Sequence, residues 1–206
     1  MIRGLDTLVR TLSVANRPLI LTGAGLSVAS GLPAYRQGAD AVWDRFVLDW
    51  GTSQRFVRDP SAWWQRFWLK VHALTPATVV PNPGHLAIAQ LATLKSGLIV
   101  VTQNIDGLHE ITGIHRDQLV EVHGRHDRYH CIDPACPGFA DQTERVDLLA
   151  IGRGVVPTCG LCGGLVRPTV LLFDEAYDSH PYYRSREAFG ALAEADMLIC
   201  VGTSYA

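Results

Sequence analysis

The sequence predicts an α/β protein built on a doubly wound, parallel, Rossmann-like sheet. Three short apolar runs, Pro18 to Thr22, Leu98 to Thr102 and Met197 to Gly202, show no alternation of apolar and polar residues, and turn residues follow each of them. Such runs are typical of strands that are buried on both faces of a sheet. Helical patterns separate the runs, and this succession of strands and helices favours the doubly wound class.

Size and charge limit the kinds of partner. The chain has 206 residues, of which 48% are hydrophobic and 18% charged, so it can bury the core of one α/β domain with a small satellite. Its formal net charge of -2 supplies no basic field for a phosphodiester backbone. We therefore expect no nucleic-acid partner, and the sequence leaves the oligomeric state open.

The first apolar pattern, Met1 to Ala15, reads as an amphipathic helix that also carries charged residues. It lacks the uninterrupted apolar core of a signal peptide, and no stretch reaches the ~18 apolar residues of a membrane span. We therefore expect a cytoplasmic protein without a membrane partner. In that compartment thiols stay reduced, and paired cysteines more often hold a metal than form disulfides.

Two segments interrupt the alternation of strands and helices. The sequence predicts a Rossmann-like core over 1–36, 81–124 and 167–206, which includes a helix from Gly84 to Lys95. A Trp-rich insertion over 37–80 is predicted to form a helical lobe. The second insertion, over 125–166, contains four cysteines and has too few apolar residues to form a core without a metal.

The four cysteines predict a structural zinc site. Cys131, Cys136, Cys159 and Cys162 have the spacing C-x4-C-x22-C-x2-C, which brings two pairs of thiolates into a closed tetrahedral cage. A closed site leaves no coordination position for catalysis, so the metal is expected to fold the module. His126 and His130 could replace one cysteine, although we expect them at the surface. Cys200 lies in the last apolar run and is expected to be a buried strand thiol.

A Gly-rich turn follows the first strand. In Gly23-Ala24-Gly25-Leu26-Ser27 the glycines let a ligand approach the backbone, and the next helix offers free N–H groups, which predicts a pyrophosphate seat. Val28 replaces the third glycine of the dinucleotide fingerprint, and no strand ends in the expected acidic residue. A plain tight turn is therefore the alternative.

Polar residues also follow two further strands. Gln103, Asn104 and Asp106 come directly after Leu98 to Thr102, and ligands of open α/β sheets bind at that end of a strand. Asn and Asp are equally ordinary turn and N-cap residues. His123 follows the apolar pattern Leu119 to Val122, where it is either structural or, with its pKa near neutrality, a general base.

Taken together, these motifs resemble the sirtuin (Sir2) family of NAD-dependent protein lysine deacylases. The resemblance covers nearly the whole chain. Its motifs are Gly23 to Ser27, Ser30 to Arg36, Thr102 to His109, His123-Gly124, the four cysteines, Arg167 to Glu175 and Gly202-Thr203-Ser204.

The resemblance implies that NAD is consumed as a co-substrate. The nicotinamide–ribose bond breaks, the acyl oxygen of a substrate lysine captures the anomeric carbon, and water then releases lysine and O-acyl-ADP-ribose. By the same resemblance Zn²⁺ is the second cofactor and has a structural role. Two alternatives share the NAD site: an NAD hydrolase or mono-ADP-ribosyltransferase, and a non-catalytic domain that binds ADP-ribose.

The resemblance also assigns residues. His123 is the implied general base, and Asn104 and Asp106 the implied catalytic residues that orient the nicotinamide carboxamide and its water. The implied cofactor-binding residues are Gly23, Ala24, Gly25, Ser27, Tyr35, Arg36, Gln103, Asn104, Ile105, Asp106, Gly202, Thr203 and Ser204. The implied partner is an acyl-lysine protein or peptide, added as a strand near Val170, Leu171, Phe173 and Glu175.

Several positions depart from the family pattern. Tyr35 replaces a Phe and keeps the aromatic shield, whereas Asp174 replaces the Gly of a Phe-Gly-Glu turn and is expected to alter peptide binding. The chain ends at Ala206, where the family's sheet continues, so weak NAD binding is expected. Phe67 and Lys70 stand where members that remove acidic acyl groups carry Tyr and Arg, which favours a neutral acyl group.

Overall fold

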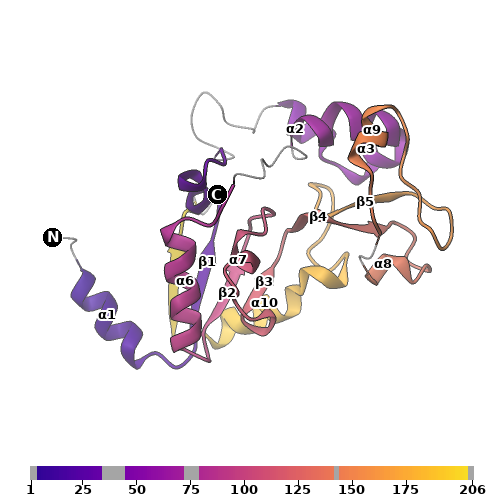
Figure 1. Cartoon of the computed structure of the whole chain (residues 1–206). Coiled ribbons are helices and arrows are strands. Elements are labelled where there is room, and N and C mark those ends of the chain that lie inside the picture. Colours follow the sequence, from indigo (N-terminus) through magenta and orange to yellow (C-terminus); the bar gives the residue numbers. More distant parts are fainter. Residues whose placement is uncertain (1–3, 34–44, 72–78, 142–143, 204–206) are drawn as a thin grey trace.

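The computed structural model describes residues 4–33, 45–71, 79–141 and 144–203 (Figure 1). Its strands are β1 (Pro18–Thr22), β2 (Ile99–Thr102), β3 (Leu119–Glu121), β4 (Gly124–Cys131), β5 (Val166–Val170) and β6 (Met197–Val201). Its helices are α1 (Leu5–Val14), η1 (Ala24–Ser30), α2 (Arg45–Trp50), α3 (Ser53–Arg58), α4 (Pro60–Ala62), η2 (Trp63–Trp68), α5 (Leu69–Val71), α6 (Pro83–Leu94), α7 (Leu108–Ile111), η3 (Arg116–Gln118), α8 (Gly138–Asp141), α9 (Leu148–Gly152), η4 (Pro181–Tyr183) and α10 (Ser185–Glu194).

The three apolar runs form neighbouring strands of one parallel sheet, as predicted. The order is β3-β2-β1-β6, and Leu21 of β1 lies opposite Val101 on one side and Cys200 on the other. The chain winds outward from β1 to β3 and then returns to the far side of β1. The winding direction therefore reverses between β1 and β6, and such a switch point is where open α/β sheets bind ligands.

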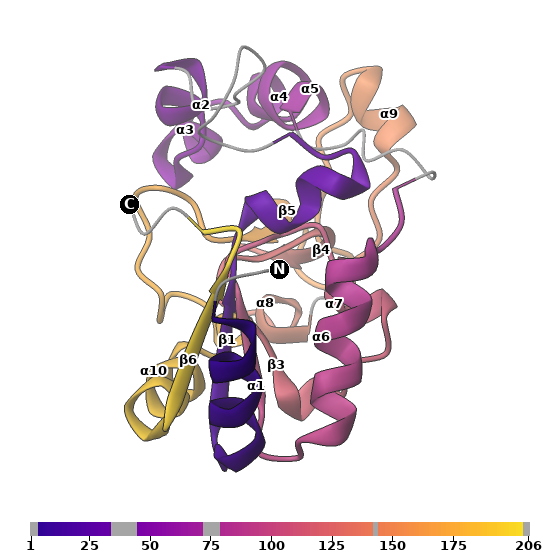
Figure 2. The same ribbon diagram turned by 90° about the vertical axis from the view of Figure 1, so that its left-hand side faces the viewer.

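Helices cover both faces of this sheet, as the doubly wound class requires. Ile88 of α6 packs with Ile20 on one face, and Ala188 of α10 packs with Leu19 on the other. Consecutive residues of a strand point to opposite faces, which is why β1 needs apolar residues throughout. Figure 2 shows α6 and α10 on opposite sides of the strands.

The first helix and the last strand of the described chain are both partly exposed. Helix α1 lies within the predicted range, but none of its residues is buried. Cys200 is only half-buried, so the expectation of a buried thiol is wrong, and Leu198 beside it is 49% exposed. The reason is that, among the described residues, β6 pairs with β1 alone and lies at the end of the sheet, a position that the apolar run could not reveal.

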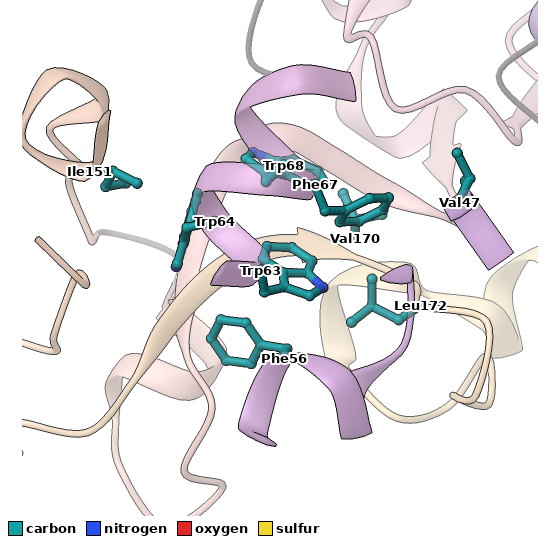
Figure 3. Packing of buried hydrophobic residues seen from close by; sticks show 9 residues of the cluster. All are labelled: Val47, Phe56, Trp63, Trp64, Phe67, Trp68, Ile151, Val170 and Leu172. Carbon is teal, nitrogen blue, oxygen red and sulfur yellow. The ribbon is translucent and has the colours of Figure 1, made fainter. Parts of the chain in front are cut away.

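The helices between 45 and 71 are held by a tryptophan cluster (Figure 3). Trp63 and Trp68 stack with ring centroids 5.4 Å apart, and Phe56 meets Trp63 edge to face. The tryptophan cluster consists of Val47, Phe56, Trp63, Trp64, Phe67, Trp68, Ile151, Val170 and Leu172. Ile151 belongs to α9, so a helix from the cysteine-rich insertion completes the core of the helical segment.

Strands β4 and β5 form an antiparallel ribbon that leads from the sheet to the cysteines. At its base Gly124 has φ of +76°, and a Cβ there would lie 1.8 Å from the carbonyl oxygen of Thr169. Only glycine fits such an approach. Leu171 N also donates to the carbonyl of His123 at 3.0 Å, so the ribbon fixes the backbone of this histidine.

In the part of the chain that the structure describes, no helix is both long and apolar enough to cross a membrane.

Candidate active site

Two turns meet at the switch point of the sheet. The turn after β1 leads into the 3₁₀ helix η1, and Gly25 N donates to the carbonyl of Gly202, after β6, at 2.9 Å. A Cβ on Gly202 would lie 2.1 Å from Leu26 N, so only glycine permits this contact between the two backbones. Val28 is 49% exposed on η1, so its side chain has room in the solvent and no third glycine is needed there.

A polar cluster of Ser27, Asn104 and Asp106 joins the ends of β1 and β2. The hydroxyl of Ser27 donates to Asp106 Oδ2 at 2.7 Å, and Asn104 Nδ2 donates to Ser27 Oγ at 3.1 Å. Asn104 Nδ2 also donates to the carbonyl of Gly23 at 3.1 Å. These bonds fix the direction of each side chain, and together the three groups offer a hydroxyl, an amide and a carboxylate to one ligand.

The loop between Gln103 and Asp106 is anchored from three sides. Gln103 N donates to the carbonyl of Thr22, and Thr203 Oγ1 donates to Gln103 Oε1 at 3.2 Å. The carbonyl of Ile105 accepts from the backbone N–H of His126 at 3.0 Å and lies 2.7 Å from its Nδ1. Half-buried His126 therefore supports this loop and is not the free surface residue that the sequence led us to expect.

His123 lies next to this loop with a defined tautomer. Its Nδ1 is 2.8 Å from the carbonyl oxygen of Gln103. A carbonyl can only accept, so Nδ1 carries the proton and Nε2 keeps the lone pair of the neutral ring. Burial lowers the pKa of His123, and the bond to Gln103 offsets part of that effect. At neutral pH the ring is therefore a base whose lone pair is on Nε2.

Two buried histidines behind the cluster escaped prediction as site residues. His109 Nε2 lies 3.0 Å from Thr22 Oγ1, and the rings of His109 and His85 are 5.0 Å apart. Burial, followed by the charge of His85, lowers the pKa of His109 to about 4. His109 follows Asp106 by three residues, and this spacing was the signal available in the sequence.

Arg125 also escaped prediction, although it supports the Asp106 loop. A Cβ on Gly107, which has φ of +74°, would lie 2.4 Å from Arg125 Cζ. The guanidinium therefore packs directly beneath this turn. Its partners are Asp127, at 2.8 Å, Glu121, at 3.3 Å, and Glu110. These partners hold the pKa of Arg125 above its usual value against the effect of burial, so a fixed positive charge underlies the loop.

The four cysteines converge, as predicted. Their sulfur atoms all lie within 4.8 Å of one another, with 3.5 Å between Cys131 and Cys162 and 3.7 Å between Cys136 and Cys159. These distances exclude disulfides, which need about 2.05 Å. A ZnS₄ tetrahedron with 2.3 Å bonds has edges of about 3.8 Å, so the cage fits structural zinc.

Backbone amides support the sulfur atoms of this cage. Leu161 N lies 3.4 Å from the sulfur of Cys159, and Gly164 N lies 3.3 Å from that of Cys162. Such donors favour the thiolate form that binds a metal.

His130 corrects a prediction about the same module. The sequence led us to expect a surface residue, but its side chain is 1% exposed and its Nδ1 lies 3.0 Å from Thr169 Oγ1. Burial, with the nearby charges of Arg167 and His180, lowers its pKa to about 2. The reason is that β4 pairs with β5 and α8 packs against β4, which places His130 among Thr169, Phe139 and His180.

The residues expected near an acyl-lysine peptide differ in exposure. Val170 is buried in the tryptophan cluster, while Leu171 is half-buried and bonded to His123. Phe173 is 48% exposed, and its N–H donates to the carbonyl of Gly51. Glu175 pairs with Arg167 at 2.5 Å. Of these four residues, Phe173 therefore has the most exposed side chain.

Asp174 has a structural task in this region. Its carboxylate accepts from Ser53 N at 2.6 Å, from Ser53 Oγ at 2.8 Å and from Gln54 N at 3.1 Å. It thus caps the beginning of α3 from a segment 120 residues away in the sequence. Burial acts to raise the pKa of Asp174, but these hydrogen bonds outweigh it and lower the pKa.

The remaining predicted positions divide into two groups. Phe67 is 2% exposed and belongs to the tryptophan cluster, whereas Lys70 is exposed. Tyr35, Arg36 and Ser204 lie outside the described residues, so the structure leaves their roles as predictions.

Comparisons with known proteins agree on one family. The family model described as "Sir2 family" matches residues 23–206. A Dictyostelium discoideum protein named NAD-dependent deacetylase sir2E is 37% identical, and the match covers 97% of this chain but 62% of that protein. NAD-dependent protein deacylase 1 of Pseudomonas aeruginosa is 38% identical over 95% of this chain and 76% of its own length.

Solved structures agree with the sequence relatives. A Sir2 homologue mutant in complex with ADP-ribose has a TM-score of 0.77 at 29% identity, covering 98% of this chain and 75% of that one. A Sir2 homologue in complex with NAD has a TM-score of 0.74 at 30% identity, covering 97% and 72% of the two chains. A Sir2 complex with a p53 peptide and NAD⁺ has a TM-score of 0.71 at 27% identity, covering 98% and 77%.

Proposed function

The chain belongs to the Sir2 family, and from this membership we propose that it acts as an NAD-dependent protein lysine deacylase. The observation that carries the proposal is the neutral tautomer of His123, held by Gln103 beside the Ser27, Asn104 and Asp106 cluster. Several relatives carry the name NAD-dependent protein deacetylase or deacylase. The zinc cage is closed and has no part in the reaction.

The donors and acceptors at the strand ends fit NAD. Hydroxyl, amide and carboxylate groups match the ribose hydroxyls and the carboxamide, and the turn at Gly23 to Ser27 suits the pyrophosphate. Bound NAD would supply a glycosidic bond whose cleavage leaves an electrophilic sugar carbon. Asn104 and Asp106 would orient the nicotinamide, and Gln103 would contact its ribose. His123 would take a proton from a ribose hydroxyl at Nε2.

The direct test is product formation. Purified protein is incubated with NAD and a panel of acyl-lysine peptides, and O-acyl-ADP-ribose is measured by mass spectrometry. We expect product from the wild type and a loss of about 10²-fold or more for His123→Ala, because general bases contribute 10²–10⁴-fold. His115→Ala is the matched control, since that side chain is 74% exposed and outside the site. Equal product from the wild type and His123→Ala would contradict the proposal.

The substrate is proposed to be a peptide segment with a neutral acyl group on lysine. Solved relatives include a complex with a p53 peptide, which supports a peptide substrate. Phe67 is packed within the tryptophan cluster and has no hydroxyl, and Lys70 lacks the guanidinium fork that binds a carboxylate bidentately. We expect acetyl-lysine peptides to react faster than succinyl-lysine peptides of the same sequence. The reverse order would refute this preference.

The same assay distinguishes deacylation from the alternative reactions of NAD. NAD hydrolysis or ADP-ribosyl transfer would release nicotinamide without an acyl peptide. Asp174, which the sequence led us to expect would alter peptide binding, has a structural role in capping α3. We further propose a cytoplasmic setting, because the zinc cage needs reduced cysteines.

A further inference from the structure

One contact at His123 was not among the interactions that the sequence predicted. The hydroxyl of Tyr177 lies 3.1 Å from His123 Nε2, the nitrogen that carries the lone pair. Because Nδ1 holds its proton toward Gln103, the bond at Nε2 has one direction in the neutral ring: the phenol donates and the imidazole accepts. The basic electron pair of His123 is therefore already engaged in the free protein.

The surroundings of Tyr177 leave its side chain room to move away from His123. Its ring stacks on His123 with centroids 5.8 Å apart, and Phe189 of α10 meets it edge to face with centroids 6.3 Å apart. Tyr177 is 39% exposed and Phe189 is 61% exposed. The segment has firm anchors on both sides, namely Glu175 on Arg167 and buried His180. Tyr177 itself lies in the turn between them, so its side chain can move while the anchors stay.

A ring nitrogen has a single lone pair and cannot accept from two hydroxyls at full strength. We propose that Tyr177 is a gating residue, whose hydroxyl occupies Nε2 of His123 in the free protein and is displaced by a ribose hydroxyl of the bound cofactor. The inference rests on the proposed NAD site. It explains how a base in a half-buried position stays hydrogen-bonded before its substrate arrives, as buried polar atoms require.

The proposed gate predicts the direction in which a substitution of Tyr177 changes the affinity for ADP-ribose. Tyr177→Phe keeps the ring contacts with His123 and Phe189 but removes the competing donor. A neutral hydrogen bond that must be broken before a ligand binds lowers affinity by roughly 2- to 10-fold. We therefore expect Tyr177→Phe to bind ADP-ribose roughly 2- to 10-fold more tightly than the wild type does.

The experiment is isothermal titration calorimetry with ADP-ribose, which binds without turnover. The proteins are the wild type, Tyr177→Phe, His123→Ala and the double variant. If the phenol acts through Nε2, the gain of Tyr177→Phe disappears in the His123→Ala background. Tyr129→Phe removes the same hydroxyl from a ring that packs against Trp64 in the tryptophan cluster, and it should leave the affinity unchanged.

The possible results distinguish a failure of the proposed gate from a failure of the proposed function. Unchanged or weaker binding by Tyr177→Phe overturns the gate and leaves the NAD site intact. An equal gain in both backgrounds also overturns it, since the effect would not pass through His123. Failure of every protein to bind ADP-ribose would contradict the proposed function itself. A ¹⁵N spectrum of the ligand-free protein adds a direct readout: the Nε2 resonance of His123 should move in Tyr177→Phe and stay in Tyr129→Phe.

Discussion

At the scale of single residues, the protonation states and orientations of the groups around the site depend on burial and on individual hydrogen bonds. Burial keeps His123 neutral, and the carbonyl of Gln103 leaves Nε2 as its basic atom. Burial beside Thr22 and His85 keeps His109 neutral. Gly107 and Arg125 show the same dependence on one contact, because only a residue without Cβ can lie on the guanidinium. These are the positions where small substitutions have effects of predictable sign.

His109 should make the protein less stable in acid. Its pKa is about 4 in the folded protein and about 6.5 when exposed, so the unfolded chain binds the proton first as the pH falls. The free energy of unfolding should therefore decline between pH 6.5 and pH 4, with roughly 3 kcal/mol from this group. Urea unfolding across this range measures the decline. His109→Gln should reduce the slope and exposed His115→Gln should retain it; identical slopes in both variants would refute the assignment.

Gly107→Ala should destabilise the Asp106 loop. The new Cβ meets both a left-handed backbone conformation and the guanidinium of Arg125 at 2.4 Å. Gly113→Ala is the matched control, because Gly113 has φ of +82° with no atom within 4 Å of the added Cβ. Backbone strain alone costs about 1–2 kcal/mol, so Gly107→Ala should exceed its control in loss of unfolding free energy and should also weaken ADP-ribose binding. Equal losses would mean that Arg125 does not support the turn.

At the scale of elements, two long-range contacts join segments that the sequence places in different regions. Ile151 of α9 packs into the tryptophan cluster although it lies between the cysteines, and Asp174 caps α3 from the segment after β5. The helical segment is therefore held by residues that follow it by about a hundred positions. Neither contact leaves a signal in the local sequence pattern.

Asp174→Ala should loosen α3 from the core. Thr52 is the N-cap residue of α3, and the Asp174 carboxylate accepts from the next two amides; loss of such a capping side chain costs about 0.5–2 kcal/mol. The pKa of Asp174 is lowered, so its contribution is present at neutral pH and is lost as the pH falls below about 4. Hydrogen exchange at the amides of Ser53 and Gln54 should become faster. Asp59→Ala, which removes the cap of α4, is the control that should leave these two amides protected.

At the scale of the whole molecule, the cysteine cage ties the ribbon of β4 and β5 to the segment between them. The small core at the cage contains Cys131, Cys136, Cys159 and Val166, so sulfur atoms are most of its apolar content. Such a core has little stability of its own, and structural zinc can supply ~10 kcal/mol in small units. Because Leu171, which directly follows β5, bonds to the backbone of His123, loss of the metal should reach the active site indirectly.

Removal of the metal should unfold the module. Chelation, or Cys159→Ser, is expected to lower the melting temperature, release zinc and reduce deacylation. Cys200→Ser changes a cysteine outside the cage and should preserve both zinc content and stability. Zinc is measured by atomic emission, and melting by circular dichroism. A Cys159→Ser variant with full zinc and unchanged melting would contradict the assignment.

The sequence by itself determined the strands of the sheet, the glycine turn and the four metal ligands, because each depends on short-range spacing. It also placed Ser27, Asn104 and Asp106 at strand ends, where a parallel sheet must bring them together. Only the tertiary structure decided that His130 is buried and that β6 lies at the end of the described sheet. It alone also showed that Asp174 caps a helix and that the hydroxyl of Tyr177 bonds to Nε2 of His123. Those outcomes depend on which distant segments pack against each residue, and burial and hydrogen bonding between distant segments leave no periodic trace in the chain.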